Sequence, residues 1–201
     1  MTIRSILSLV AAAAFAACGG GEPADSESGG TGGEGAPAPA PSTTTPAPPS
    51  GPLTVPDWYT VDNDARTVTM EVVGGLTPDN NYWNFNGAIN GNMAITVPEG
   101  YRVVIDFVNR DPNMAHSLGI SAETSNFATP PQPNPVFEGA ITENPGSMVD
   151  GTMPGERETV EFVAERAGSY SMVCYIPGHT AVGMWLYFNV SANGEAGIQT
   201  R

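Results

Sequence analysis

The sequence predicts an all-β domain built as a sandwich, and three observations carry that prediction. Short segments alternate apolar and polar residues with the period of a strand, turn residues separate these segments, and no segment shows a convincing helical period. The folded part, residues 53–201, is long enough for one hydrophobic core of ordinary size. We therefore expect a single domain in which two sheets pack face to face.

The expected strands follow one another with turn signals between them. The clearest alternation runs over residues 67–72, and residues 101–108 alternate in the same way after a Pro-Glu-Gly turn. The full set is 67–72, 93–97, 101–108, 116–121, 159–164, 169–175 and 183–190. Residues 122–158 are rich in Pro, Gly, Asn and acids, and we expect a long irregular insertion there.

Two segments precede the domain. Residues 1–17 are typical of an export signal, because Arg4 gives a minimal positive region and the apolar run after it is too short to span a bilayer. Residues 18–52 consist mostly of Gly, Pro, Ala, Ser and Thr, which predicts a disordered linker. Cys18, after Phe-Ala-Ala, resembles the lipidation site of bacterial lipoproteins. That resemblance implies an exported protein that is anchored through Cys18 to the cell membrane and faces the periplasm or the cell exterior.

The segment from Cys174 to Met184 places a thiol, the His179 imidazole and a thioether at even five-residue steps. His116 is the other histidine of the chain. Trigonal His₂Cys coordination with a weak axial Met is the ligand set of a blue-copper electron-transfer centre, because the sulfur ligands suit Cu(I) and imidazole suits both oxidation states. Zinc is disfavoured because a thioether is a poor fourth ligand. We expect one copper ion bound by His116, Cys174, His179 and Met184.

The strand period explains how these residues meet. Alternation turns Tyr170, Met172 and Cys174 to one face, which points Cys174 inward at the end of its strand. His116 is expected to begin another strand, and the Ser117 amide is then placed to donate to the Cys174 sulfur. With no second thiol beside Cys174 in the domain, no disulfide competes for the sulfur.

The loop around His179 carries few charges. We expect an uncharged rim around an exposed His179 imidazole edge, where a redox partner would dock, formed by Ile176, Pro177, Ala181 and Val182. The aromatic pairs Trp58-Tyr59 and Tyr82-Trp83 are interpreted as packing, as such pairs usually are in β-sandwiches.

The charge balance excludes one class of partner. The chain has 21 acidic residues against 7 basic ones, and its net charge is −14. Such a surface repels nucleic acid and keeps the protein soluble, and we expect a monomer.

The motif around the proposed ligands resembles the sulfocyanin and rusticyanin branch of the cupredoxins, sulfocyanin most closely. The resemblance rests on residues 174–185, on the segment Asn-Phe-Asn-Gly at 84–87 and on the His116-Ser117 strand, and it covers roughly residues 67–190. It implies a Greek-key β-sandwich with one mononuclear type 1 copper that shuttles single electrons. No dinuclear copper site is implied, since that site needs two cysteines in the loop.

Three functions are compatible with this ligand set. The first is a membrane-tethered electron carrier between a respiratory complex and a terminal oxidase or other reductase, which is not an enzyme. The second is a copper-dependent reductase subunit, which needs an open coordination position that Met184 argues against. The third is a copper-binding and transfer protein, although its methionines are scattered rather than gathered in a tract.

Overall fold

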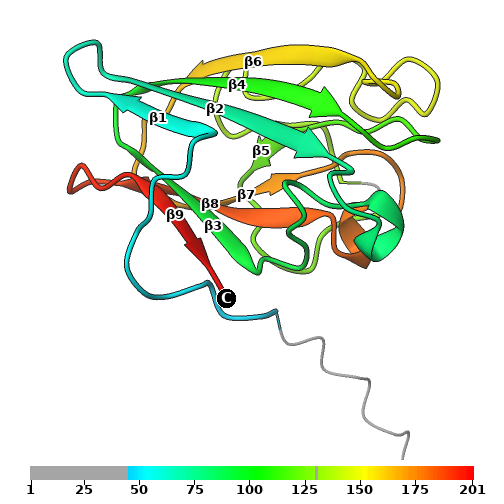
Figure 1. The fold of residues 1–201 in the computed structure, drawn as a ribbon, viewed down its shortest axis with the longest axis horizontal. Coiled ribbons are helices and arrows are strands. Elements are labelled where there is room, and N and C mark those ends of the chain that lie inside the picture. The colour runs from blue at the N-terminus through cyan, green and yellow to red at the C-terminus, as the bar shows by residue number, and fades with distance from the viewer. Residues whose placement is uncertain (1–44, 130) are drawn as a thin grey trace, which may run out of the picture. The chain divides into compact units, whose positions relative to one another are not determined.

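The computed structural model describes residues 45–129 and 131–201. The chain forms two β-sheets with two short 3-10 turns at one end (Figure 1). The elements are β1 (Tyr59–Asp62), β2 (Thr67–Gly74), η1 (Asp79–Tyr82), β3 (Met93–Pro98), β4 (Arg102–Asn109), β5 (Gly119–Ser121), β6 (Arg157–Val163), β7 (Gly168–Val173), η2 (Thr180–Val182), β8 (Trp185–Ser191) and β9 (Gly197–Thr200). Within the described ranges, no helix has the length and apolar character needed to cross a membrane.

Strands that follow one another in the sequence often belong to different sheets. One sheet has the order β1-β2-β4-β6 and the other the order β5-β7-β8-β3-β9. β2 and β4 pair in parallel, while β3, which lies between them in sequence, pairs in parallel with β8 in the opposite sheet. These crossovers confirm the predicted all-β sandwich and require contacts between residues far apart in the chain.

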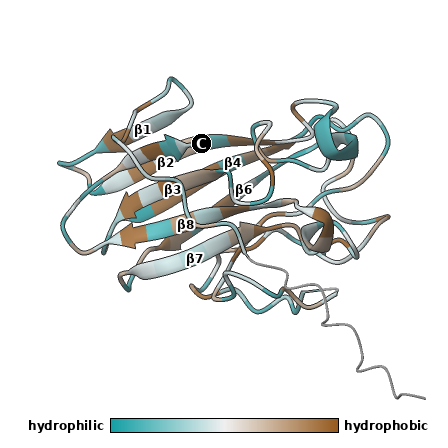
Figure 2. Cartoon of the chain, turned by 90° about the horizontal axis from the view of Figure 1, so that it is seen from below, coloured by the Kyte–Doolittle hydropathy of each residue, from teal (hydrophilic) through white to brown (hydrophobic). Residues whose placement is uncertain are grey.

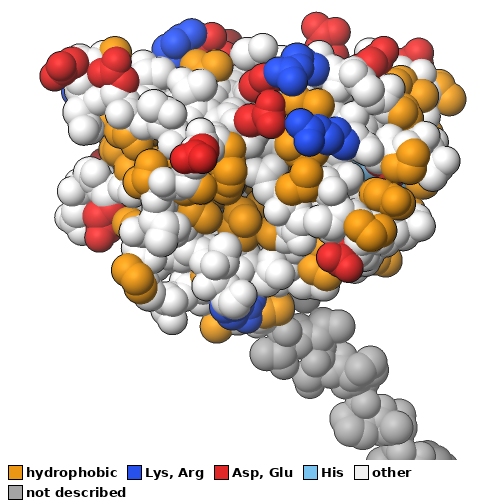
Figure 3. All heavy atoms as spheres, viewed as in Figure 1, with side chains coloured by type: hydrophobic (Ala, Val, Ile, Leu, Met, Phe, Trp, Pro, Cys, Tyr) orange, Lys and Arg blue, Asp and Glu red, His pale blue; other side chains and the backbone are white. Residues whose placement is uncertain are grey.

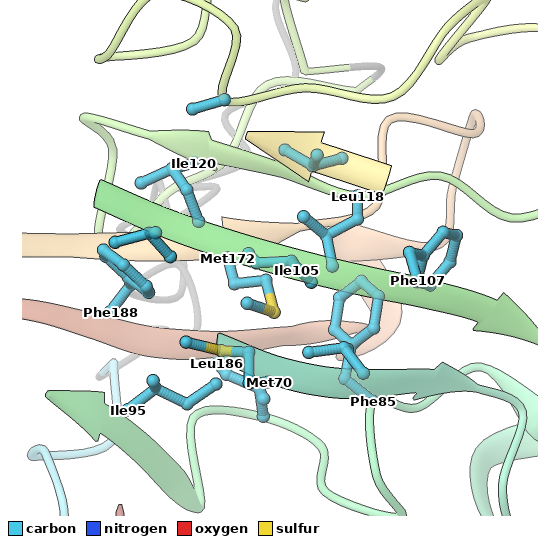
Figure 4. Packing of buried hydrophobic residues seen from close by; sticks show 14 of the residues in the cluster. Met70, Phe85, Ile95, Ile105, Phe107, Leu118, Ile120, Met172, Leu186 and Phe188 are labelled. Carbon is cyan, nitrogen blue, oxygen red and sulfur yellow. The ribbon is translucent and has the colours of Figure 1, made fainter. Parts of the chain in front are cut away.

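The core lies between the sheets. Met70 and Ile105 of one sheet point toward Met172, Leu186 and other apolar side chains of the facing sheet (Figure 4). Apolar and polar residues alternate along the strands, as the colours of Figure 2 show. This alternation is the pattern from which the strands were predicted, and it gives each sheet one buried face.

Some boundaries differ from the expectation. β1 and β9 were not predicted, because each is four residues long and too short to show a period. The strand expected over 116–121 is also shorter, since β5 begins at Gly119 and His116 forms only a single bridge with Thr152. His116 therefore lies in a loop that one bridge fixes, and the prediction that it begins a strand was wrong.

The irregular insertion is present. In the described part of 122–156 there is no named strand, and isolated bridges join Gly119 to Ile141 and His116 to Thr152. Phe137 of the insertion is buried and stacks on Phe162 of β6 with parallel rings 5.5 Å apart. The insertion is thus part of the core and braces the loop that carries His116.

The chain before the domain is described from residue 45. The Tyr187 hydroxyl donates to the Pro46 carbonyl at 2.5 Å, and the Gln199 side chain donates to the Gly51 carbonyl at 2.5 Å. The last residues of the segment predicted as linker therefore contact β8 and β9. The export signal, Cys18 and most of that linker lie outside the described residues.

Candidate metal centre

Three donor atoms converge at the end of the sandwich that carries η1 and η2. The Nδ1 atoms of His116 and His179 lie 3.2 Å apart, and the Cys174 Sγ lies 3.9 Å and 3.6 Å from them. All three side chains are at most 1% exposed. Atoms that bind one ion at about 2.0 to 2.3 Å lie about 3 to 4 Å from one another. The spacing of the three donors therefore fits ligation of a single ion.

Local hydrogen bonds close the loop that carries two of these ligands. The Thr180 hydroxyl donates to the Cys174 carbonyl at 2.5 Å and accepts from the Cys174 amide at 3.1 Å. Gly178 has a φ of +90°, which glycine adopts readily, and the turn there is closed by a bond from the His179 amide to the Ile176 carbonyl. The loop therefore holds Cys174 and His179 in a fixed relation.

Met184 lies at the end of the same loop. Its amide donates to the His179 carbonyl at 2.9 Å, and its carbonyl accepts from the Cys174 amide at 3.3 Å. The side chain is fully buried in the same core cluster as Cys174. The backbone of Met184 is thus bonded to Cys174 and His179 and its side chain is buried, while its role as a ligand stays a prediction.

A buried carboxylate orients His116. The Asp111 Oδ2 accepts from His116 Nε2 at 2.9 Å, while its Oδ1 accepts from the amides of Asn113 and Met114. The proton of the imidazole is thereby held on Nε2, so the lone pair of Nδ1 points toward the cluster. Gly75 permits this arrangement, because a Cβ there would lie 2.6 Å from the Asp111 amide nitrogen.

The sulfur of Cys174 is enclosed by hydrogen-bond donors. The amides of Ser117 and Ile176 hydrogen-bond to it, and the Ser117 hydroxyl lies 3.7 Å away. The predicted Ser117 contact is therefore present, and the Ile176 amide adds a second. Burial nevertheless raises the pKa of the Cys174 thiol to about 11. A bound cation is then what holds the sulfur as a thiolate at neutral pH.

Both imidazoles are neutral in the protein without metal. Burial, together with the neighbouring His116, lowers the pKa of His179 to about 3. Burial also lowers the pKa of His116, although Asp111 acts in the opposite direction. Neutral imidazole is the form that binds metal, so neither ring needs to lose a proton before binding.

The surroundings of His179 differ from the prediction. His179 is 1% exposed rather than open at its edge, because the Trp83 indole stacks on it at 4.0 Å between ring centroids with planes 17° apart. Ile176 is also fully buried and does not belong to the rim, whereas Pro177, Ala181 and Val182 are exposed as expected.

Sequence reasoning missed two residues of this site. Trp83 was interpreted as packing, and its contact with His179 joins segments too far apart in the chain for any local pattern to reveal. Asp111 carries a weak signal, because Asp-Pro-Asn is a turn sequence directly before the histidine. Its bond to His116 became visible only in the folded chain.

The donor set selects the metal. Two imidazoles, one thiolate and one thioether combine borderline and soft ligands, which suit copper in both oxidation states and give zinc a poor fourth ligand. The buried position excludes water from the donors, and the Nδ1 atoms of His116 and His179 face each other 3.2 Å apart, while His116 Nε2 is bonded to Asp111 on the other side of its ring. These features together fit a copper ion.

Comparison with known proteins gives consistent matches. Residues 57–199 match the family described as the sulfocyanin (SoxE) domain. The sulfocyanin of Sulfolobus acidocaldarius is 30% identical over 136 residues, which cover 65% of this chain and 67% of that protein. The rusticyanin of Acidithiobacillus ferrooxidans is 29% identical over 127 residues, covering 63% of this chain and 77% of the relative.

Solved structures are similar over the same region. A structure of rusticyanin from Thiobacillus ferrooxidans has 26% identity and a TM-score of 0.47, covering 67% of this chain and 87% of that one. Reduced auracyanin from Roseiflexus castenholzii has 23% identity and a TM-score of 0.44, covering 61% of this chain and 96% of that one.

Proposed function

This chain belongs to the sulfocyanin family of the cupredoxins, and we propose that it carries single electrons between membrane-bound respiratory partners through a copper ion held by His116, Cys174, His179 and Met184. The observation that carries the proposal is the convergence of three buried donor atoms within 3.2 to 3.9 Å of one another. Proteins of this family are type 1 copper electron carriers rather than enzymes.

The copper supplies a one-electron couple between Cu(I) and Cu(II). The chain supplies a site that changes little between the two states: hydrogen bonds from Thr180 and Met184 fix the ligand loop, and Asp111 fixes the His116 ring. A densely packed core resists rearrangement, which keeps the energetic cost of changing oxidation state small. Burial of Cys174 and His179 keeps water away from the ligands.

The same burial argues against a reductase. Reduction of a small molecule at the metal needs an open coordination position that the substrate can reach, whereas here the Met184 side chain is fully buried and Trp83 covers His179. An electron carrier needs only a short path from the surface to the site.

Partners are proposed to dock beside the ligand loop. Pro177, Ala181 and Val182 are exposed and uncharged, and Figure 3 shows hydrophobic side chains gathered at the end of the domain that bears η1 and η2. An uncharged contact suits brief encounters between redox proteins, which bury little surface. The donor and acceptor proposed are a respiratory complex and a terminal oxidase or other reductase.

Membrane anchoring is the second part of the proposal, and the sequence around Cys18 supports it. A lipid on Cys18 and the linker after it would keep the domain near the membrane, within reach of its partners. The wild-type protein should partition with membranes, and Cys18→Ala should release it into the soluble fraction, because stable anchoring takes two or more acyl chains. Wild-type protein found soluble, with Met1 retained, would contradict the anchor.

Copper titration tests the electron-carrier proposal. The purified protein should bind one copper per chain and turn blue, and the colour should disappear and return on reduction and reoxidation. Cys174→Ser should remain colourless, because a hydroxyl is neither soft nor ionised at neutral pH. A matched control is Ser171→Ala, which alters a buried hydroxyl on β7, the strand that leads into Cys174. A blue Cys174→Ser variant would refute the site.

A further inference from the structure

The His179 imidazole is buried and has almost no contact with solvent. It is 1% exposed, and its Nε2 is buried without a hydrogen-bond partner among the residues that the structure describes. Its Nδ1 faces Cys174 and His116. A redox partner that docks on this end therefore does not touch the imidazole edge.

What lies over the imidazole is the indole of Trp83. The two rings are nearly parallel, 17° apart, with centroids separated by 4.0 Å, so they are in direct contact over their faces. Trp83 itself is only partly buried. One face of the indole meets the ligand ring and its Nε1 is buried, while another part of the side chain is exposed at the surface.

The loop that carries Trp83 is built to hold it. Asn84 is fully buried, and its side chain donates to the carbonyls of Thr77 and Asp79 and accepts from the Gly87 amide. Just before Trp83, three consecutive residues adopt left-handed backbone angles, with φ of 52°, 59° and 64° at Asn80, Asn81 and Tyr82. Such conformations are costly for residues other than glycine and persist where the surrounding structure enforces them.

We propose that Trp83 is the electron-exchange contact of this protein, in the place where an exposed edge of His179 was expected. The indole gives a continuous path of touching π-faces from the surface to a ligand of the metal. The partner it fits is a one-electron redox protein that presents an apolar, uncharged contact, since the exposed residues of the loop that carries the stacked His179 are Pro177, Ala181 and Val182.

In this role Trp83 is not itself oxidised or protonated. With copper held at this site, one electron would pass from the reduced centre of a donor to the metal, and later from the metal to an oxidised acceptor. The indole and imidazole only shorten the gap that the electron crosses. The inference rests on the proposed function and adds the route of transfer to it.

Self-exchange between oxidised and reduced copies tests the route without needing the natural partner. Copper-loaded protein is mixed in both oxidation states, and NMR line broadening gives the rate. Trp83→Leu should slow self-exchange several-fold, because the route from the surface to the metal ligand then lacks one of its two touching rings. Trp83→Phe, which keeps a ring on His179, should recover most of the rate. Trp58→Leu is the control, because Trp58 is also partly buried but does not contact the ligands.

A second readout does not depend on electron transfer. In the Cu(I) protein, exchange of the His179 Nε2 proton with water should be faster in Trp83→Leu, because the cover is gone. If Trp83→Leu does not fold, Trp83→Met, which also lacks a ring but fills more space, replaces it in both measurements.

The outcomes separate the two proposals. A ringless variant that stays blue but exchanges electrons as fast as wild type, or faster, overturns the role of Trp83 and returns the route to the uncovered imidazole. Unchanged proton exchange at His179 overturns it as well, since Trp83 would not be the cover. Wild-type protein that binds no copper, or that shows no self-exchange at all, would instead overturn the proposed function.

Discussion

The Asp111 carboxylate sets both the tautomer of His116 and the charge beside the metal site. It is 2% exposed and accepts three hydrogen bonds, two from backbone amides and one from His116 Nε2. A negative charge so close to the ligands favours Cu(II), the more highly charged state.

Asp111→Asn should therefore raise the reduction potential. Removing such a partner typically weakens metal binding about 10- to 100-fold. Cu(I) carries one positive charge fewer than Cu(II), so its binding affinity should fall less than that of Cu(II). The reduction potential should therefore rise by at most about 120 mV, at 59 mV per tenfold change in relative affinity. Spectroelectrochemical titration measures it, with Asp64→Asn, the same change at an exposed turn, as the control. A lower potential in Asp111→Asn would contradict this role of the carboxylate.

Metal uptake should release one proton at neutral pH, and that proton comes from Cys174. The thiol has a pKa of about 11 without metal, whereas the pKa of His179 is lowered to about 3 and that of His116 is lowered too, so both rings are already neutral. The apparent copper affinity should then rise about tenfold per pH unit between pH 7 and 9. Calorimetry in two buffers of different ionisation heat counts the protons. Release of two or more would mean that a histidine was protonated beforehand.

The depressed histidine pKa values also fix the sign of the acid response of the apoprotein. Unfolded histidine has a pKa of 6.5, above the folded values, so below that pH the unfolded chain binds more protons than the folded one. The free energy of unfolding of the metal-free domain therefore falls as the pH drops through this range.

The insertion between β5 and β6 contributes to the core. Phe137 is 3% exposed, stacks on Phe162 and meets Tyr170 edge to face at 5.2 Å. Phe137→Ala should lower the free energy of unfolding by about 3 to 5 kcal/mol, as large-to-small changes of buried aromatics do. Chemical denaturation of the metal-free protein measures the change, and Val149→Ala, at a residue 73% exposed, should cost little. Equal free energies of unfolding for Phe137→Ala and wild type would show that the insertion is not anchored in the core.

Most of the longer strands were predictable because each shows its own period. β2, β3, β4, β6, β7 and β8 all overlap the predicted ranges. β9 could not be predicted, since its four residues are fixed by tertiary pairing with β3 and by a bridge from Thr54. The candidate copper ligands could likewise be proposed from the sequence, because three of them share one loop. Asp111 and Trp83 could not, because their contacts depend on how distant loops meet.

The molecule as a whole is strongly acidic, with a net charge of −14. Two copies therefore repel each other, and self-exchange should become faster as salt is added, until the charges are screened over about 8 Å at physiological ionic strength. The exposed, uncharged residues of the ligand loop are then where copies and partners approach most closely.

A charge placed on that end should slow transfer. Val182 is 49% exposed beside the ligand loop, and Val182→Glu should lower the self-exchange rate at every salt concentration by adding a desolvation cost at the contact. Its colour and potential should stay close to wild type, because residue 182 is not a ligand. Thr69→Lys, at an exposed position of β2, should change mainly the salt dependence. Equal rates for Val182→Glu and wild type would place the contact elsewhere on the surface.

Copper-edge X-ray absorption on the loaded protein reports directly on the atoms around the metal. We expect one short copper–sulfur distance and two copper–nitrogen distances, from Cys174, His116 and His179, in both oxidation states. Their lengths should change little on reduction, since the hydrogen-bonded loop holds the ligands in place. A spectrum without a short sulfur ligand, or one that Cys174→Ser leaves unchanged, would contradict a type 1 copper site in this protein.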